Sequence, residues 1–179
     1  MKKFILLLTL TAFCFGGSLK WEKLTDEQRD VAKRIYEVAI LHDLAETMIA
    51  IAWQESRLGK IAINLADRAS CGVHHIHIKT YLWLNGIKNT ITNQNYWCVE
   101  LIKSPELSTI SAITLFERAK THFKGDFNSA IKSHNAGYNI NSTSANDYLK
   151  SVRAYMQDAK KVVEIIETLN HFDRGGCKW

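Results

Sequence analysis

The chain has 179 residues, of which 46% are hydrophobic, and its formal net charge is +5 at neutral pH. Two of the basic side chains are Lys2 and Lys3, so the rest of the chain holds 21 basic against 18 acidic side chains, an ordinary balance for a globular domain. No basic run supports a nucleic-acid-binding role, and no long apolar run after the N-terminus supports a membrane span.

Residues 1–18 have the pattern of a secretory signal peptide. Two lysines precede an apolar run that ends at Phe15, and small residues follow it. The run is shorter than the roughly 20 residues that a transmembrane helix needs. Cys14 raises lipidation as an alternative, which the bulky Phe13 before it disfavours. We therefore expect export to the periplasm or cell envelope and a mature domain over 19–179, long enough to bury its own core.

The first part of the mature chain has helical periodicity. Thr25 and Gln28 form the pattern of a capping box, which predicts a helix over about 25–42. A second helix is predicted over about 45–58, and Gly59 provides a natural end for it. Its apolar side chains occur nearly all round, as in a helix buried at the centre of a domain.

The middle and the end of the chain are also mostly helical in pattern. The stretch from 60 to 77 has mixed polarity and small residues, which predicts a long loop or a small sheet. Three helices are predicted downstream: one that follows a turn at 104–106 and ends near residue 124, one over about 127–134, and one from a Ser144–Asp147 cap to about residue 169, followed by a short tail. The prediction is a mainly α-helical single domain.

An acidic side chain, Glu55, stands near the C-terminal end of the apolar second helix. Desolvation and the negative end of the helix dipole both favour the protonated carboxyl group there. A carboxylic acid that keeps its proton near neutral pH can protonate the departing oxygen of a glycosidic bond. The alternative is a solvated carboxylate at the helix end, paired with Arg57 or Lys60.

Four short blocks, with Glu55 in the first, resemble the soluble lytic transglycosylase family in kind and order. The blocks are Glu55-Ser56, the segment CGVHHI at 71–76, the segment SHNAG at 133–137, and Tyr148 on the last predicted helix. They are similar to that family's E-S, G-L-M-Q-I-like and A-Y-N-A-G motifs and to the tyrosine that opens a late helix. The resemblance spans about 25–164 and implies a fold like that of goose-type lysozymes.

The resemblance also implies roles for individual residues. Glu55 matches the catalytic acid, Ser56 the supporting residue beside it, and Tyr148 a tyrosine whose hydroxyl lies close to the acid. The remaining matched positions would support the site or bind substrate, and they are Gly72, Val73, His75, Ile76, His134, Asn135 and Ala136. His75 replaces the family's usual glutamine and His134 its usual tyrosine, and both histidines can titrate near neutral pH. We expect Glu55 and Tyr148 to face each other across a cleft floored by residues 72–76.

The implied reaction is cleavage of the β-1,4 bond between N-acetylmuramic acid and N-acetylglucosamine in peptidoglycan. Glu55 would protonate the bridging oxygen, and the substrate's own N-acetyl group would stabilise the positive charge that develops. The ionised carboxylate would then take the proton of the C6 hydroxyl, which closes a 1,6-anhydro ring. The resemblance thus implies a lyase that needs no cofactor and has peptidoglycan glycan strands as its partner.

Two other functions remain open. A lysozyme-type muramidase would need a positioned water, often held by a second carboxylate, and Asp67 is the candidate for that role. The alternative for Asp67 is a surface loop residue paired with Arg68. A catalytically silent peptidoglycan-binding protein is the third possibility, since His75 and His134 depart from the family motifs.

Cysteines, histidines and aromatic residues complete the candidates. Export makes a disulfide plausible, and we expect Cys71–Cys98 because Cys177 falls in the tail; three reduced thiols are the alternative. The histidines at 74, 75 and 77 lack a carboxylate or cysteine at ligand spacing, so no metal is expected. Five aromatic residues could line a sugar groove, namely Trp53, Trp83, Tyr81, Tyr96 and Trp97. Most of them should lie in the core, and Tyr81 and Tyr96 are the candidates for contact with substrate.

Overall fold

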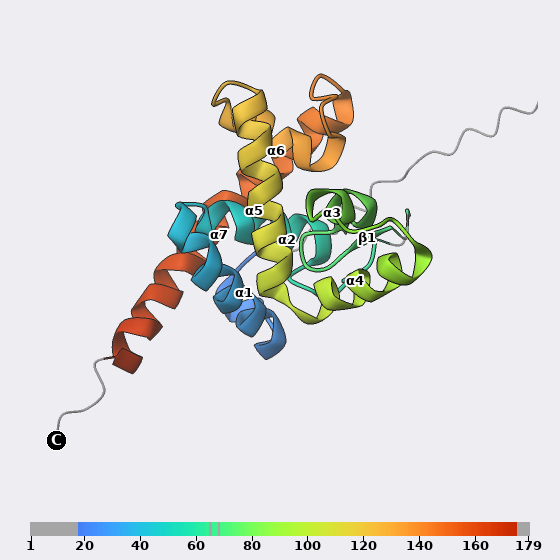
Figure 1. Cartoon of the computed structure of the whole chain (residues 1–179). Helices are drawn as coiled ribbons and strands as arrows, with labels where there is room; N and C mark the ends of the chain where they lie inside the picture. Colours follow the sequence, from blue (N-terminus) through green and yellow to red (C-terminus); the bar gives the residue numbers. More distant parts are fainter. Residues whose placement is uncertain (1–17, 65, 68, 175–179) are drawn as a thin grey trace, which may run out of the picture.

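The computed structural model describes residues 18–64, 66–67 and 69–174. Within these ranges the chain is mainly α-helical, as predicted, with one small two-stranded sheet (Figure 1). None of the described helices is long and apolar enough to cross a membrane. The expected signal peptide up to residue 17, and Cys177, lie outside the described residues.

The central helix of the molecule is α2 (Ala45–Ser56), which packs against α1 (Asp26–Ala39), α5 and α7. The capping box that opens α1 is confirmed: the Gln28 backbone N–H donates to the Thr25 hydroxyl, and the Thr25 N–H donates to the Gln28 side chain. Three-residue 3-10 turns precede and follow α1 (Trp21–Lys23 and Ile40–His42). As predicted, α2 is buried nearly all round, because other helices surround it.

The segment after α2 forms the small sheet. Its strands are β1 (Ser70–Cys71) and β2 (Ile76–His77), which pair antiparallel. Two helices follow that the sequence did not predict, α3 (Ile78–Leu84) and α4 (Ile91–Lys103). On α4 only Leu101 is fully buried, while Trp97, Cys98 and Ile102 pack half-buried against the core.

The remaining helices are α5 (Pro105–His122), α6 (Phe127–Ala136) and α7 (Thr143–Arg174). The predicted turn before α5 is instead the start of the helix, because the Ser104 hydroxyl caps it and Pro105 is its first residue. The cap of α7 also differs from the prediction. The Ser142 hydroxyl, not that of Ser144, accepts a hydrogen bond from the Ala145 N–H. Helix α7 runs beyond the predicted end into the expected tail.

The buried hydrophobic side chains of these helices form one cluster. In Figure 1, α5 runs upright past α2, while α3, α4 and the sheet lie together on one side of it. Helix α6 packs against both α5 and α7. The ends of α2 and α6 and the loop between β1 and β2 are thereby brought together, which is where the four sequence blocks meet.

Candidate active site

The end of α2 is held to the loop between β1 and β2 by Ser56. This side chain is fully buried, and its hydroxyl donates to the carbonyl oxygen of Val73 at 2.7 Å and accepts from the Gly59 N–H at 2.8 Å. The backbone takes left-handed angles at Arg57 and Leu58, so α2 ends two residues earlier than predicted. The first and second sequence blocks are therefore in direct contact.

Gly72 is required by both the conformation and the packing of this loop. Its φ is +80°, and a Cβ at this position would lie 2.7 Å from both the Leu101 carbonyl oxygen and the Ser108 hydroxyl. Its N–H donates to the Ala62 carbonyl oxygen. After Gly72 the loop buries Val73 in the core, so this matched residue supports the site. Ile76 is also buried, but it contributes to the wall of a neighbouring groove.

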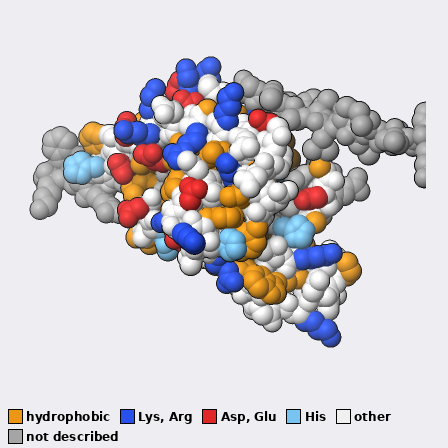
Figure 2. Space-filling view, turned by 90° about the horizontal axis from the view of Figure 1, so that it is seen from above, with side chains coloured by type: hydrophobic (Ala, Val, Ile, Leu, Met, Phe, Trp, Pro, Cys, Tyr) orange, Lys and Arg blue, Asp and Glu red, His pale blue; other side chains and the backbone are white. Residues whose placement is uncertain are grey.

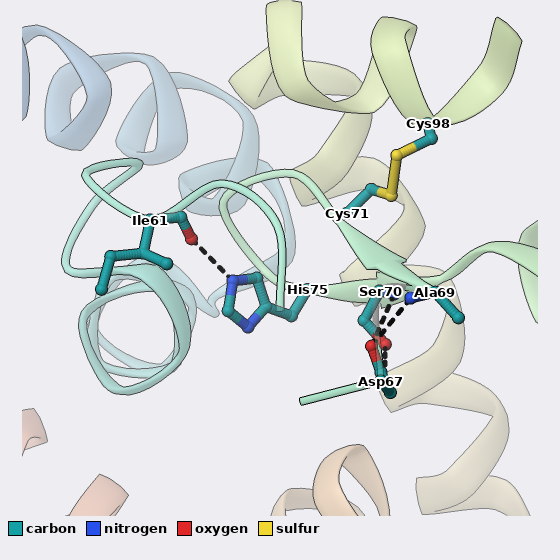
Figure 3. Close-up of a disulfide and its surroundings, with 7 residues drawn as sticks. All are labelled: Ile61, Asp67, Ala69, Ser70, Cys71, His75 and Cys98. Atoms are coloured by element: carbon teal, nitrogen blue, oxygen red, sulfur yellow. Dashed lines mark hydrogen bonds between the residues drawn. A yellow bond between two sulfur atoms is a disulfide. The ribbon is translucent and has the colours of Figure 1, made fainter. Parts of the chain in front are cut away.

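The carboxylate of Glu55 lies beside the imidazole of His75. The distance between Glu55 Oε2 and His75 Nδ1 is 3.3 Å, and the side chains are only 15% and 7% exposed. The other ring nitrogen, Nε2, lies 2.7 Å from the Ile61 carbonyl oxygen (Figure 3). Glu55 is therefore largely shielded from water beside His75, and it is not the solvated carboxylate at the helix end that was the alternative.

Burial alone would lower the pKa of His75. The hydrogen bonds to Glu55 and to the Ile61 carbonyl, together with the negative charges of Glu55 and Asp67, outweigh burial and raise this pKa above its ordinary value. His75 also has a positive φ of 46°, which is uncommon for a residue other than glycine. The backbone conformation of His75 and the hydrogen bond of its Nε2 to the Ile61 carbonyl thus both hold the ring beside Glu55.

Tyr148 on α7 also faces the acid, but from a buried position. Its hydroxyl has no hydrogen-bond partner among the described residues. Burial, and next the negative charge of Glu55, raise the pKa of Tyr148 well above its usual value. The expectation of Glu55 and Tyr148 on opposite walls of an open cleft is wrong in one respect: both lie near each other, but Tyr148 is buried.

His134 joins the third block to the second and the fourth. Its Nε2 lies 2.9 Å from the His74 carbonyl oxygen, and its ring stacks on that of Tyr148 with 6.3 Å between centroids. The His74 side chain is fully buried against the Met48 carbonyl oxygen. Burial, followed by the charge of His134, lowers the pKa of His74 to about 3, so this histidine is neutral. All four blocks are therefore within one contact network.

A groove of about 660 Å³ opens beside this network. His75, His134 and Asn135 line it, whereas Glu55 and Tyr148 do not; Glu55 reaches its edge through His75. Ala136 is the half-buried last residue of α6. On the face in Figure 2, histidine side chains lie among hydrophobic ones with lysine and arginine nearby. The groove lies between the sheet and α3 on one side and α5 and α6 on the other.

The aromatic residues of the groove differ from those expected. Trp83, 67% exposed, and Tyr138 line it. Tyr81 is buried against Trp97, and Tyr96 is exposed outside the groove, so neither of the two preferred candidates lines it. Trp83 was one of the five aromatic residues that could line a sugar groove, but it was not preferred, because its helix was not predicted. Tyr138 could have been found, because it directly follows the third block.

Two basic side chains, Lys79 and Arg118, also line the groove. The Arg118 guanidinium lies 5.0 Å from the centre of the Trp83 ring, which orders both side chains at the groove wall. This wall can therefore attract a ligand that carries carboxylates. Neither residue was singled out from the sequence, since an isolated lysine or arginine there gave no signal.

Asp67 stabilises a turn with both of its carboxylate oxygens. One carboxylate oxygen accepts from the backbone N–H groups of Ala69 and Ser70, and the other accepts from the Ser70 hydroxyl (Figure 3). Burial alone would raise the pKa of Asp67, but these hydrogen bonds lower it. Arg68, its expected partner, lies outside the described residues.

Cys71 and Cys98 form a disulfide, which is the pairing predicted from the sequence. It ties β1 to α4, and in Figure 3 it lies on the other side of His75 from Ile61. Among residues 18–64, 66–67 and 69–174, no group of three or more His, Cys, Asp or Glu side chains is placed to hold a metal ion.

No protein-family model, curated protein or solved structure matches this chain. The resemblance to lytic transglycosylases therefore depends on the four sequence blocks. Their contacts place one carboxyl group, Glu55, between His75 and Tyr148 at the edge of a groove.

Proposed function

We propose that this protein is a lytic transglycosylase that cleaves the β-1,4 bond between N-acetylmuramic acid and N-acetylglucosamine in peptidoglycan and forms a 1,6-anhydro product. One observation carries the proposal. Glu55 ends a buried helix with its carboxylate largely shielded from water, beside a groove lined by aromatic and basic side chains. The four blocks that the chain shares in order with the family converge on this carboxylate.

In this mechanism Glu55 is the only general acid and base. Its carboxyl group protonates the bridging oxygen while the N-acetyl group of the substrate stabilises the charge at C1. The carboxylate then accepts the C6 hydroxyl proton as the anhydro ring closes. The Tyr148 hydroxyl is buried near Glu55, where it can donate to the carboxylate after at most small movements.

The groove supports peptidoglycan as the substrate class. Trp83 and Tyr138 offer aromatic faces on which sugar rings can stack. Lys79 and Arg118 add positive charge, which suits a polymer whose muramic acid and peptide stems carry carboxylates. Asn135 supplies an exposed amide for hydrogen bonds.

A transglycosylase is favoured over a muramidase because a second free carboxylate is lacking in the described part of the groove. Asp67 lines the groove, but both of its oxygens accept hydrogen bonds from the turn that it caps. It is therefore poorly suited to hold an attacking water. With one carboxyl group available, the internal C6 hydroxyl is the simpler nucleophile.

The test is digestion of purified sacculi, with the released muropeptides identified by mass. We expect anhydro products, each lighter by one water than the product of a hydrolase. Glu55→Gln should lower the rate by about 100-fold or more. Glu46→Gln, in the first turn of the same helix, is the matched control and should leave the rate unchanged.

Three results would contradict the proposal. Products with reducing ends would identify a muramidase, and sacculus binding without any released muropeptide would identify a silent binding protein. Full activity of Glu55→Gln would show that another group is the acid.

The proposal includes export of the protein to the periplasm or cell envelope. Its basis is the signal-peptide pattern of residues 1–18 in the sequence. N-terminal sequencing of the protein from a cell-envelope fraction should find cleavage near Ser18, whereas an intact N-terminus in the cytosol would contradict export.

A further inference from the structure

We propose that His75 and Glu55 act as a proton-sharing pair, in which the imidazole stores the proton that Glu55 delivers to the glycosidic oxygen. This inference rests on the proposed function. It makes His75 a positioning residue that acts through Glu55, and it assigns a purpose to a histidine that replaces the family's usual glutamine. Its consequence is that Glu55 remains supplied with a proton at higher pH than an isolated carboxyl group would.

The geometry determines which nitrogen of His75 faces the acid. Nε2 lies 2.7 Å from the Ile61 carbonyl oxygen, and because a carbonyl oxygen only accepts, Nε2 carries hydrogen in the neutral as well as in the charged ring. Nδ1 is therefore the nitrogen that titrates, and it lies 3.3 Å from Glu55 Oε2. A neutral ring accepts from the carboxyl group, and a charged ring donates to the carboxylate. The contact between Nδ1 and Oε2 is therefore a hydrogen bond whether the proton is on the imidazole or on the carboxyl group.

The surroundings favour one proton on the pair. Asp67 is a further negative charge that acts on His75 and favours retention of the proton. His74 on the other side is neutral, because burial lowers its pKa to about 3. His134 is held by the His74 carbonyl oxygen, and the buried Tyr148 hydroxyl faces Glu55 and stays protonated. In these surroundings the pKa of His75 is raised above its ordinary value.

The proposed reaction leaves the number of protons on the pair unchanged. The proton on Nδ1 moves to Glu55, which leaves a neutral imidazole beside a neutral carboxyl group. Glu55 gives this proton to the bridging oxygen as the bond from C1 to that oxygen breaks and its electron pair stays with the oxygen. The C6 oxygen then bonds to C1, and its proton returns to the carboxylate and the imidazole. The pair starts and ends with one proton, and only the glycan is changed.

The first test follows the protonation of His75 directly, without any activity measurement. The ring nitrogens of the full mature protein labelled with ¹⁵N-histidine are titrated by NMR, and His75→Gln identifies the signals. We expect Nε2 to stay protonated while Nδ1 titrates. Glu55→Gln should lower the pKa of His75 by about one unit or more, whereas Glu46→Gln should not move it. An unmoved titration in Glu55→Gln, or loss of the proton from Nε2, would overturn the proposal.

The second test is the pH profile of sacculus digestion. His75→Gln should move the alkaline limb of the rate profile to lower pH by about one unit, while activity on the acid side is retained. A purely structural role would lower the rate by the same factor at every pH and would leave the limb in place. His42→Gln, at an exposed position before α2, is the control.

The two tests separate failure of this inference from failure of the proposed function. A wild-type protein that releases no product would overturn the proposed function, and the NMR titration would still decide whether the pair shares a proton. If His75→Gln does not fold, the comparison of wild type with Glu55→Gln remains decisive.

Discussion

The Ser56 hydroxyl lies 2.7 Å from the carbonyl oxygen of Val73, and this single bond joins the end of α2 to the loop that presents His75. Glu55 is adjacent to the donor and His75 is two residues from the acceptor. A fully buried hydroxyl therefore helps to set the distance between the acid and the imidazole. A serine beside the acid has a structural purpose here.

Ser56→Ala should destabilise the protein and also reduce sacculus cleavage. It leaves the Val73 carbonyl and the Gly59 N–H without their partner in a buried place, at a cost of about 1–3 kcal/mol. Urea unfolding measures this change. Thr114→Ala, which removes an exposed hydroxyl from α5, should change stability by less than about 0.5 kcal/mol. Equal losses of stability in the two variants would show that the hydrogen bonds of Ser56 contribute no more than that of an exposed hydroxyl.

Gly72→Ala should be among the most damaging single-methyl substitutions in the chain. The positive φ alone costs about 1–3 kcal/mol, and the added Cβ meets the Leu101 carbonyl oxygen and the Ser108 hydroxyl at 2.7 Å. Gly86→Ala provides the control, because Gly86 also has a positive φ, but a Cβ there meets nothing within 4 Å. Thermal unfolding should show a clearly larger loss for Gly72→Ala, and a similar loss for both would remove the packing argument.

Trp83→Ala should weaken binding to sacculi by about three- to tenfold, since an aromatic contact contributes roughly 0.5–1.5 kcal/mol. Trp83 is exposed in the groove and held by Arg118. Tyr96→Ala is the matched control, because Tyr96 is also exposed, at 56%, but lies outside the groove. Co-sedimentation of both variants with sacculi measures the difference. Weaker binding by Tyr96→Ala alone would place the glycan on α4.

The helices that could be predicted from the sequence are those with a strong local signal. The capping box of α1 and the continuous apolar face of α2 determine those elements with little help from the rest of the chain. Helix α4 has one buried residue, and it is anchored by a disulfide to a distant strand. The disulfide is a tertiary constraint, so residues 91–103 by themselves do not show how this helix is held in the fold.

The same distinction between local sequence signals and tertiary contacts applies to the candidate site. The resemblance of four short blocks to the transglycosylase motifs selected Glu55, His75, His134 and Tyr148, and the structure brings them together. The resemblance did not show that the tyrosine would be buried behind the acid, and nothing in the sequence distinguished Trp83 from the other aromatic residues that could line a groove. Those facts depend on which face of α7 and of α3 meets the neighbouring elements, and that is decided by packing between segments far apart in the sequence.

Reduction of the Cys71–Cys98 disulfide should lower stability by about 3.5 kcal/mol, the loop-closure value for this separation of 27 residues. The loop that it closes contains β2, α3 and most of α4. Guanidinium unfolding of the wild type with and without reductant gives the value, and the Cys71→Ser, Cys98→Ser double variant should behave as the reduced protein. A double variant that responds to reductant as the wild type does would place the effect on another cysteine.

The ion pair between Arg34 on α1 and Glu106 on α5 should produce a pH-dependent stability. The guanidinium of Arg34 donates to both carboxylate oxygens, with Nη2 at 2.7 Å from Oε2. These hydrogen bonds are the main reason that the pKa of Glu106 falls from 4.5 to about 2. Because the folded-state pKa is lower than the unfolded one, the pair contributes its full stability above pH 4.5 and loses it as the pH falls towards 2.

Glu106→Gln should therefore lower the free energy of unfolding at pH 7 by about 1 kcal/mol, a modest value because both side chains are about a third exposed and screened by solvent. The difference between wild type and variant should shrink as the pH falls below 4.5 and vanish near 2. Glu100→Gln removes a looser surface pair, 3.8 Å from Lys103, and should cost less than about 0.5 kcal/mol at pH 7. Urea unfolding of the three proteins from pH 2 to 7 measures these values, and a difference for Glu106→Gln that stays constant over this range would mean that the lost stability comes from packing of the side chain and not from its charge.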